Sequence, residues 1–300
     1  MGLDTALDRF AEHADEHALG IEGVQVVLDN GDRAARRWIG DIRRDVFSVS
    51  KTVTSLAIGM LYGDGLLGLD DPALLHLPEL ADTAAPGSDA ISVRHLLSMT
   101  AGNEYRWLDL DADHPGDPAR DFFATPLVAE PDTVYDYAGG NSYVLGRIVH
   151  ALSGLDLRDF LLPRLFTPLG IHNPQWLRCP LGFPLGAIGL HLRTAEIGRI
   201  AQVVLHGGEW RGQRLVPAGY LARMVSETTH TGRAEPDNQI YGLHVWMCSR
   251  DRAWRMDGIY GQFGIMLPDH RACVSVTAHY LGPTTDILDA VWEYVVPALA

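Results

Sequence analysis

Apolar residues recur along the chain with two spacings, which separate helices from strands. A three- and four-residue spacing begins at Leu3 and predicts a first helix up to about Ala18. Residues 23–29 and 33–39 resemble strands, and the intervening Asn30-Gly31 is typical of a tight hairpin turn. The helical spacing returns at 49–61, 93–99, 141–152, 157–165, 194–205, from 217 onward and at 285–294. Short apolar runs near the end predict strands at 241–247, 253–257, 262–267 and 273–280.

Strands thus occur early and late in the chain, with helices between them. This order predicts an α/β (α+β) fold: an antiparallel sheet of about five strands, completed by both chain ends and flanked by the N- and C-terminal helices. We expect residues 1–75 and 185–300 to form the sheet domain and residues 76–184 a mostly helical domain.

The predicted helix at 49–61 carries the most informative pair of residues. Ser48 stands at its start, and Lys51, the only lysine in the chain, follows three residues later. Residues three apart share a helix face, so the hydroxyl and the amine are expected within reach of each other. A buried lysine can release its proton and act as a base, which arginine cannot do. The alternative is that Ser48 only caps the helix and Lys51 is a solvated charge.

Composition narrows the choice of partners and compartment. Apolar residues make up 47% and charged residues 21%, which is ordinary for a globular chain, but the formal net charge of −14 disfavours nucleic acid. The first twenty residues are acidic and amphipathic, unlike a secretory signal, and no segment resembles a membrane span. The three cysteines, an odd number, suggest reduced thiols. We therefore expect a cytoplasmic protein with no nucleic-acid or membrane partner.

Two segments resemble metal sites. His13, Glu16 and His17 fit the spacing of a zinc-peptidase helix, but no clear third ligand follows. The stretch 109–117 resembles the start of a calcium loop, yet His114 and Arg120 occupy positions that need Gly and Glu. We expect no metal and no cofactor, and interpret the second stretch as a solvated loop.

Longer motifs point to a family. The chain contains FSVSKTVTSLAIGMLYGDGLLGLDDP, ISVRHLLSMTAG, YAGGNSYVLGRIV, GLHLRTAEIGRIAQVVLHGGEW and GIYGQFGIMLPD, in that order. This combination resembles the serine β-lactamase and penicillin-binding-protein superfamily, most closely its class C branch with esterases and 6-aminohexanoate-oligomer hydrolases. The resemblance covers nearly the whole chain. It implies a β-lactamase/transpeptidase-like fold with the active site at the domain junction, Ser48 as nucleophile and Lys51 as base.

The resemblance also implies a second motif, whose tyrosine matches Tyr137. Tyr135 and Tyr143 are neighbours, but Tyr137 stands just before the Gly-Gly-Asn turn that opens a helix. Gly139 departs from the family pattern of Asn or Ser, and Asn141 is the candidate to replace that contact with substrate.

The third motif of the family matches Met256, Asp257 and Gly258, which we expect to line the substrate site. The next residue, Ile259, is expected to supply an oxyanion-hole N–H beside that of Ser48. Met256 replaces a basic residue that holds anionic substrates in relatives, which favours neutral or cationic esters and amides.

These expectations describe a serine hydrolase that forms a covalent acyl-enzyme on a small carboxylic ester or related amide. One alternative is a β-lactamase or a D-alanyl or D-amino-acid peptidase acting through the same site. Another is a non-catalytic binding protein that retains the fold, suggested by the altered second and third motifs. The sequence leaves the acyl group, the leaving group and the oligomeric state open.

Overall fold

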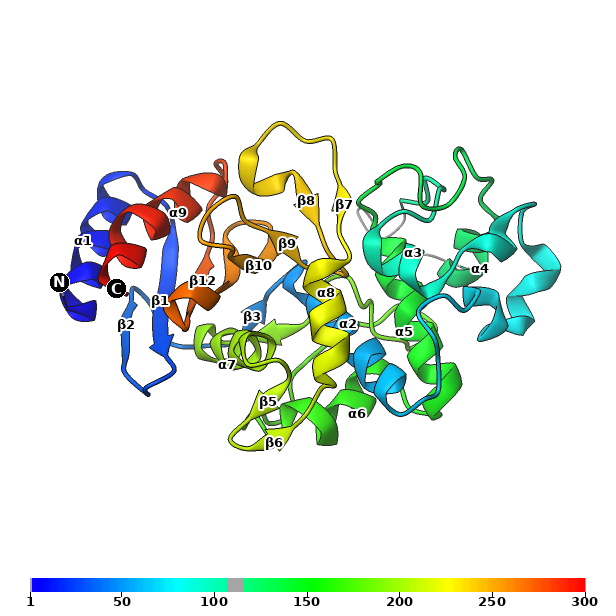
Figure 1. Cartoon of the computed structure of the whole chain (residues 1–300), viewed down its shortest axis with the longest axis horizontal. Coiled ribbons are helices and arrows are strands. Elements are labelled where there is room, and N and C mark those ends of the chain that lie inside the picture. The colour runs from blue at the N-terminus through cyan, green and yellow to red at the C-terminus, as the bar shows by residue number, and fades with distance from the viewer. Residues whose placement is uncertain (1, 107–115, 300) are drawn as a thin grey trace.

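The computed structural model describes residues 2–106 and 116–299, and its largest element is an antiparallel sheet of eight strands (Figure 1). The strand order is β2-β1-β12-β11-β10-β9-β8-β7, so the first strands of the chain pair with the last one. The five longer strands are β1 Ile21–Leu28, β2 Arg33–Arg37, β10 Trp254–Gly258, β11 Gln262–Leu267 and β12 Ala272–Ala278. The two-residue strands are β7 Thr229–His230, β8 Ile240–Tyr241 and β9 Trp246–Met247. The α/β class and the closure by both chain ends are confirmed, with three short strands beyond the expected five.

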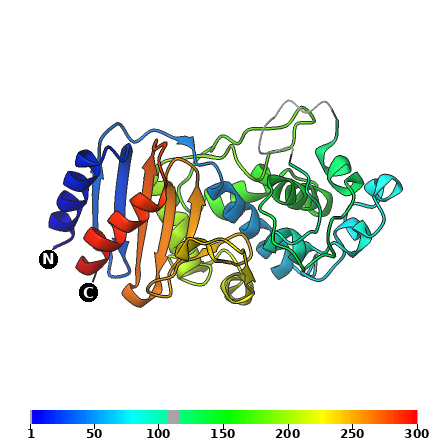
Figure 2. The same ribbon diagram turned by 90° about the horizontal axis from the view of Figure 1, so that it is seen from above.

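Helices cover both faces of this sheet (Figure 2). Helix α1, Leu3–Glu16, lies on one face beside α9, Thr285–Ala290, which a π-helical turn at Val291–Val295 extends. Helix α7, Thr194–Leu205, packs on the opposite face against β11 and β12. Every residue of β11 and β12 is buried, because helices cover these central strands from both sides.

Helix α2, Val49–Gly63, lies between the sheet and the remaining helices. Residues 49–61 are all buried, so α2 is surrounded by protein on every side. Helix α8, Ala218–Ser226, approaches it closely, since a Cβ at Gly59 would lie 2.3 Å from the ring of Tyr220. The other helices are α3 Val93–Ser98, α4 Pro118–Ala124, α5 Gly139–Ser153 and α6 Leu157–Leu161, the last extended by a π-helical turn at Leu162–Phe166. One apolar core runs from α7 through α2 into these helices, and the division into two domains stays a prediction.

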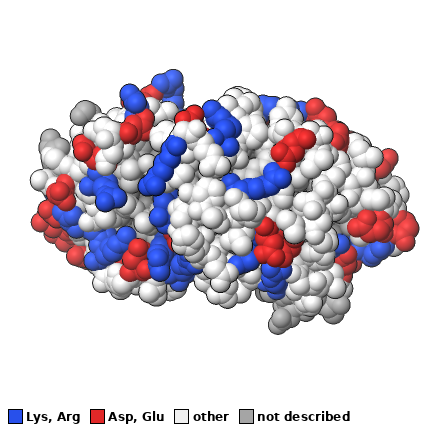
Figure 3. Space-filling view, turned by 90° about the horizontal axis from the view of Figure 1, so that it is seen from below, with Lys and Arg blue, Asp and Glu red and all other residues white. Residues whose placement is uncertain are grey.

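Two small strand pairs complete the fold. Strand β3, Arg44–Asp45, pairs with β4, His191–Leu192, just before α2 begins. Strand β5, Glu209–Trp210, pairs with β6, Gln213–Arg214. Acidic and basic side chains are interspersed on the face shown in Figure 3. Within residues 2–106 and 116–299, no helix has the length and apolar character needed to cross a membrane.

The predicted strand at 241–247 is wrong in its centre. The chain forms β8 and β9 instead, joined by a turn in which the N–H of Gly242 donates to the carbonyl of Val245 at 2.7 Å. His244 has a φ of 63° and lies in this turn. The turn is rich in apolar residues because it is buried against α2, whereas most turns lie on the surface. This apolar content led to the prediction of one continuous strand.

Candidate active site

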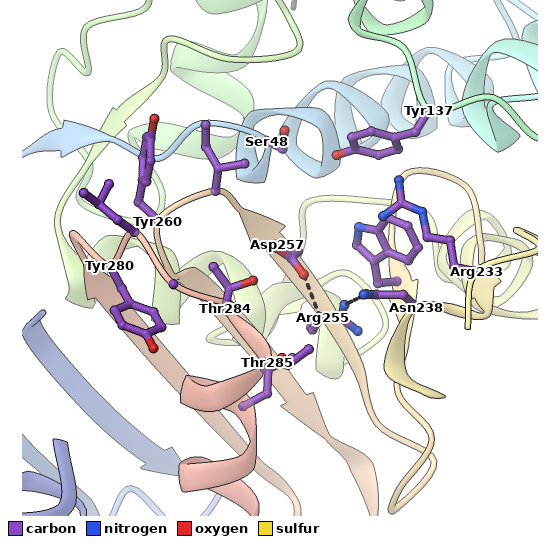
Figure 4. Close-up of a pocket in the computed structure, with 15 residues that line it drawn as sticks. Ser48, Tyr137, Arg233, Asn238, Arg255, Asp257, Tyr260, Tyr280, Thr284 and Thr285 are labelled. Carbon is purple, nitrogen blue, oxygen red and sulfur yellow. Dashed lines mark hydrogen bonds and ion pairs between the residues drawn. The ribbon is translucent and has the colours of Figure 1, made fainter. Parts of the chain in front are cut away.

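Ser48 precedes the first helical residue of α2, and its hydroxyl makes no capping hydrogen bond to the helix. Instead, the Nζ atom of Lys51 donates to the Ser48 Oγ at 2.8 Å. Ser48 also lines a cavity of about 320 Å³ (Figure 4). The hydroxyl is therefore presented to a cavity rather than used as a helix cap.

Lys51 is held away from solvent. Its exposed fraction is 4%, and its Nζ donates a second hydrogen bond to the carbonyl of Ala187 at 3.3 Å. The same nitrogen lies 4.7 Å from the centre of the Tyr137 ring, within the range of a cation–π contact. Lys51 is thus a buried amine between Ser48 and Tyr137, and the alternative of a solvated surface charge does not describe it.

A strained turn positions Ser48. Phe47 has a φ of 47°, which a bulky residue rarely adopts. The Asp45 carboxylate stabilises this turn, because its Oδ1 accepts hydrogen bonds from the N–H of Phe47 at 2.7 Å and of Gly189 at 3.0 Å. Burial raises the pKa of Asp45 despite these two donors. Such strain is found at functional sites, where the surrounding contacts enforce it.

Polar side chains of α2 hold the loops around the site. The hydroxyl of Thr52 donates to the carbonyl of His244 at 2.6 Å, and that of Ser55 donates to the carbonyl of Leu243 at 2.8 Å. The hydroxyl of Thr54 donates to the carbonyl of Gly186 at 2.8 Å, next to the residue that binds Lys51. Buried hydroxyls thereby fix the segments on both sides of the nucleophile candidate.

Of Tyr135, Tyr137 and Tyr143, only Tyr137 lines the cavity, and its hydroxyl points toward Ser48 (Figure 4). Its ring lies 5.6 Å from that of Trp246. The two neighbouring tyrosines have other places: Tyr135 packs 5.5 Å from the ring of Tyr241, and the Tyr143 hydroxyl lies 3.3 Å from Cys179 Sγ. Desolvation raises the pKa of Tyr135 and of Tyr143 far above the ordinary value, so both remain neutral packed aromatics.

Strand β10 brings its end to the cavity. Asp257 and Ile259 line the cavity, and Ile259 is 54% exposed. A Cβ on Gly258 would lie 2.4 Å from the carbonyl oxygen of Val46, so only glycine permits this approach of β10 to the turn before Ser48. Ile259 and Ser48 thus line the same cavity, and their role as the two oxyanion-hole N–H donors stays a prediction.

Met256 does not have the place that we expected for it. Its side chain is fully buried and is directed toward Gly264 on β11 and the α7 side of the sheet. Side chains alternate along a strand, so the residues on either side of Met256, Arg255 and Asp257, face the cavity instead. The argument that a missing cation at position 256 disfavours anionic substrates therefore loses its structural basis.

Asn141 also lies away from the cavity. It is 3% exposed in the first turn of α5, and its Nδ2 donates to the carbonyl of Ala138 at 3.1 Å. It is not among the described residues that line the cavity. Its proposed contact with substrate is not supported by this placement.

Sequence reasoning missed several residues of the site: Arg233, Asn238, Trp246, Arg255, Tyr260, Tyr280 and the N-terminal threonines of α9. Strand alternation could have identified Arg255 beside Asp257. Arg233 lies in the loop between β7 and β8, and no local pattern marks it.

The metal-like segments have other contacts. The rings of His13 and His17 stack 4.0 Å apart, and the Tyr294 hydroxyl lies 3.3 Å from His13 Nδ1. The calcium-like stretch lies mostly outside the described residues, including His114. Its last residue, Asp117, caps α4 and pairs with Arg147 at 2.7 Å. Across the described parts of the chain, no three His, Cys, Asp or Glu residues are grouped as metal ligands would be.

The fold is that of β-lactamases and penicillin-binding proteins: a putative β-lactamase from Bacteroides dorei superposes with a TM-score of 0.77 at 17% identity, over 97% of this chain and 98% of the other. The chain matches the Beta-lactamase family over residues 7–293, and it belongs to that family. It is 28% identical to the lovastatin esterase of Penicillium rubens over 190 residues, 54% of this chain and 46% of the relative. It is 24% identical to the 6-aminohexanoate-dimer hydrolase of Paenarthrobacter ureafaciens over 239 residues, 73% of this chain and 61% of the relative.

The chain therefore spans less than two thirds of the length of these curated relatives. Among solved structures, the D-amino acid amidase of Ochrobactrum anthropi SV3, complexed with L-phenylalanine amide, superposes with a TM-score of 0.77 at 17% identity. That alignment covers 98% of this chain and 99% of the other, which confirms the fold.

Proposed function

We propose that this protein is a serine hydrolase that cleaves a small carboxylic ester or a related amide through an acyl-enzyme. The observation that carries the proposal is the 2.8 Å hydrogen bond from the buried Lys51 Nζ to the Ser48 Oγ, at a cavity that Tyr137 also lines. Relatives named as an esterase, a 6-aminohexanoate-dimer hydrolase and an amidase support this reaction class.

The first step is attack on the acyl carbon. The Ser48 Oγ forms a bond to the carbonyl carbon while its proton passes to Lys51 and Tyr137 acting together. The negative charge that develops on the carbonyl oxygen is stabilised by the backbone N–H groups of Ser48 and Ile259. The strained turn at Phe47 and the close approach of Gly258 to the Val46 carbonyl support this role, because they restrict the two segments that carry these N–H groups.

The second step releases the leaving group. Tyr137 returns a proton to the leaving oxygen or nitrogen as its bond to the acyl carbon breaks. Water then attacks the acyl-enzyme, and the same groups return the proton to Ser48. This chain's residues supply every proton transfer in the scheme.

A non-catalytic binding protein is the alternative that the altered motifs suggested. The intact contact between Ser48 and Lys51 argues against it, since burying an amine beside a serine is costly and serves no evident packing role. The other alternative, hydrolysis of β-lactams or D-amino-acid peptides, would use the same residues. Only a comparison of rates on the different substrates distinguishes it from ester hydrolysis.

The experiment compares initial rates on short-chain p-nitrophenyl esters, a p-nitroanilide and a chromogenic cephalosporin. We expect ester hydrolysis by the wild-type protein and a loss of about a thousandfold or more in Ser48→Ala. Ser226→Ala, which alters an exposed serine at the end of α8, is the matched control and should keep the wild-type rate. Full activity of Ser48→Ala contradicts the proposal, and faster cleavage of the cephalosporin than of the esters favours the β-lactamase alternative.

A further inference from the structure

The cavity beside Ser48 contains more positive than negative charge. Three charged side chains line it: Arg233, Arg255 and Asp257. Lys51 adds a further amine behind Ser48. This local balance is opposite in sign to the net charge of −14 for the chain as a whole.

Arg255 is already committed to the protein. It is 1% exposed, and its Nε donates to the Asp257 carboxylate at 2.9 Å. Its Nη1 donates to the carbonyl of Asp237 and its Nη2 to Asn238 Oδ1, both at 2.6 Å. Burial opposes the charge of Arg255, yet the Asp257 carboxylate and the Cys248 thiol raise its pKa overall. Arg255 and Asp257 therefore form an internally compensated pair.

Arg233 differs from Arg255 in its exposure and in its lack of an ion-pair partner among the described residues. It is exposed, and it takes part in none of the ion pairs formed by residues 2–106 and 116–299. Its guanidinium carbon lies 5.1 Å from the centre of the Trp246 ring and 5.7 Å from that of Tyr137. The two aromatic rings hold the guanidinium at the cavity without neutralising it. The charge of Arg233 is thus available to a molecule in the cavity.

The position of Arg233 also indicates which part of a substrate it meets. Figure 4 shows Tyr137 and Arg233 on one side of Ser48, and Tyr260 and Tyr280 on the other. Tyr137 is the proposed proton donor to the leaving group. A substituent of the leaving group consequently extends along the side of the cavity where Arg233 lies.

We propose that Arg233 binds a carboxylate on the leaving group of the substrate, so that the preferred substrates are esters or amides of carboxylate-bearing alcohols, phenols or amines. A planar guanidinium presents paired donors that match the two oxygens of a carboxylate. This inference rests on the proposed function, because it assigns the leaving-group side from the role of Tyr137. It replaces the expectation of neutral or cationic substrates that the sequence at position 256 had suggested.

The test uses two acetate esters that differ only in charge on the leaving group, para-acetoxybenzoate and para-acetoxybenzamide. The measured quantity is the ratio of their kcat/KM values in each variant, because intrinsic ester reactivity cancels when ratios are compared. Arg233→Gln should lower the ratio by about tenfold, mainly through a higher KM for the carboxylate ester. Arg233→Lys, which keeps the charge but not the planar fork, should fall between the two. Arg252→Gln removes an 81% exposed arginine that is not among the described cavity-lining residues, and should leave the ratio unchanged.

A binding measurement separates this inference from the proposed hydrolysis. In the Ser48→Ala background, calorimetry compares para-hydroxybenzoate with para-hydroxybenzamide, with and without Arg233→Gln. Preferential binding of the carboxylate that disappears with Arg233→Gln supports the subsite even if no ester is hydrolysed. A ratio of kcat/KM values, or of binding constants, that stays within about twofold of the Arg233 parent overturns it.

Discussion

Acid should destabilise this protein through one buried histidine. His244 is 1% exposed; its Nδ1 donates to the carbonyl of Leu97 at 2.7 Å, and its Nε2 accepts from the Ser142 hydroxyl at 2.8 Å. Burial, with a smaller contribution from the positive charge of Lys51, lowers the pKa of His244 to about 3. The folded protein therefore holds this imidazole neutral at every pH where an unfolded histidine begins to charge.

The sign and size of the effect follow from proton linkage. An unfolded histidine has a pKa of about 6.5, so below that pH the unfolded chain binds a proton that the folded chain does not. The stability that depends on a neutral His244 is fully present above about pH 6.5 and is lost as the pH falls toward 3. The slope is about 1.4 kcal/mol per pH unit, so acidification from about pH 6.5 to about pH 4.5 should remove roughly 2–3 kcal/mol.

The assay is urea unfolding, followed by circular dichroism, between about pH 8 and about pH 4.5 for the wild type and His244→Asn. Asparagine tolerates the φ of 63° and retains a donor for Leu97. The variant should be less stable near pH 8, since the Ser142 hydroxyl loses its partner, by roughly 1–3 kcal/mol. The gap between the two proteins should then shrink as the pH falls. Burial also lowers the pKa of His95, but that residue is present in both proteins and cancels. A gap that stays constant over this pH range would refute the reasoning.

Two further substitutions test the site. Lys51→Arg keeps a charge but cannot accept a proton, so we expect a folded protein with kcat about three orders of magnitude lower, roughly 4 kcal/mol; retention of more than about a tenth of wild-type kcat would show that the proton goes elsewhere. Gly258→Ala places a Cβ 2.4 Å from the Val46 carbonyl, which should displace Ile259. We expect a lower kcat and a free energy of unfolding that is roughly 1–3 kcal/mol smaller. Unchanged urea unfolding would show that β10 moves without cost.

The elements with strong periodicity were predictable from the sequence. Helix α2 carries an apolar stripe that begins directly after Ser48, and the hairpin of β1 and β2 is marked by Asn30-Gly31. The short strands β8 and β9 were not, because their separation depends on the contacts of His244 with α2 and with Leu97. Such tertiary contacts leave no trace in local spacing.

The site shows the same limit. Ser48 and Lys51 are three residues apart on one helix, so their contact follows from helix geometry. The face of β10 that meets the cavity depends on strand parity, which placed Met256 on the wrong side in the prediction. Arg233 comes from a loop nearly two hundred residues away from Ser48, and only the folded structure brings it to the cavity.

The central claim is that Ser48 is a nucleophile that becomes acylated. The most direct measurement is intact-mass analysis after exposure to a phosphonate probe for activated serines, followed by peptide mapping. The account predicts one adduct per chain, located on Ser48, with complete loss of esterase activity, and no adduct in Ser48→Ala. Labelling of a different residue, with Ser48→Ala still fully active, would contradict it.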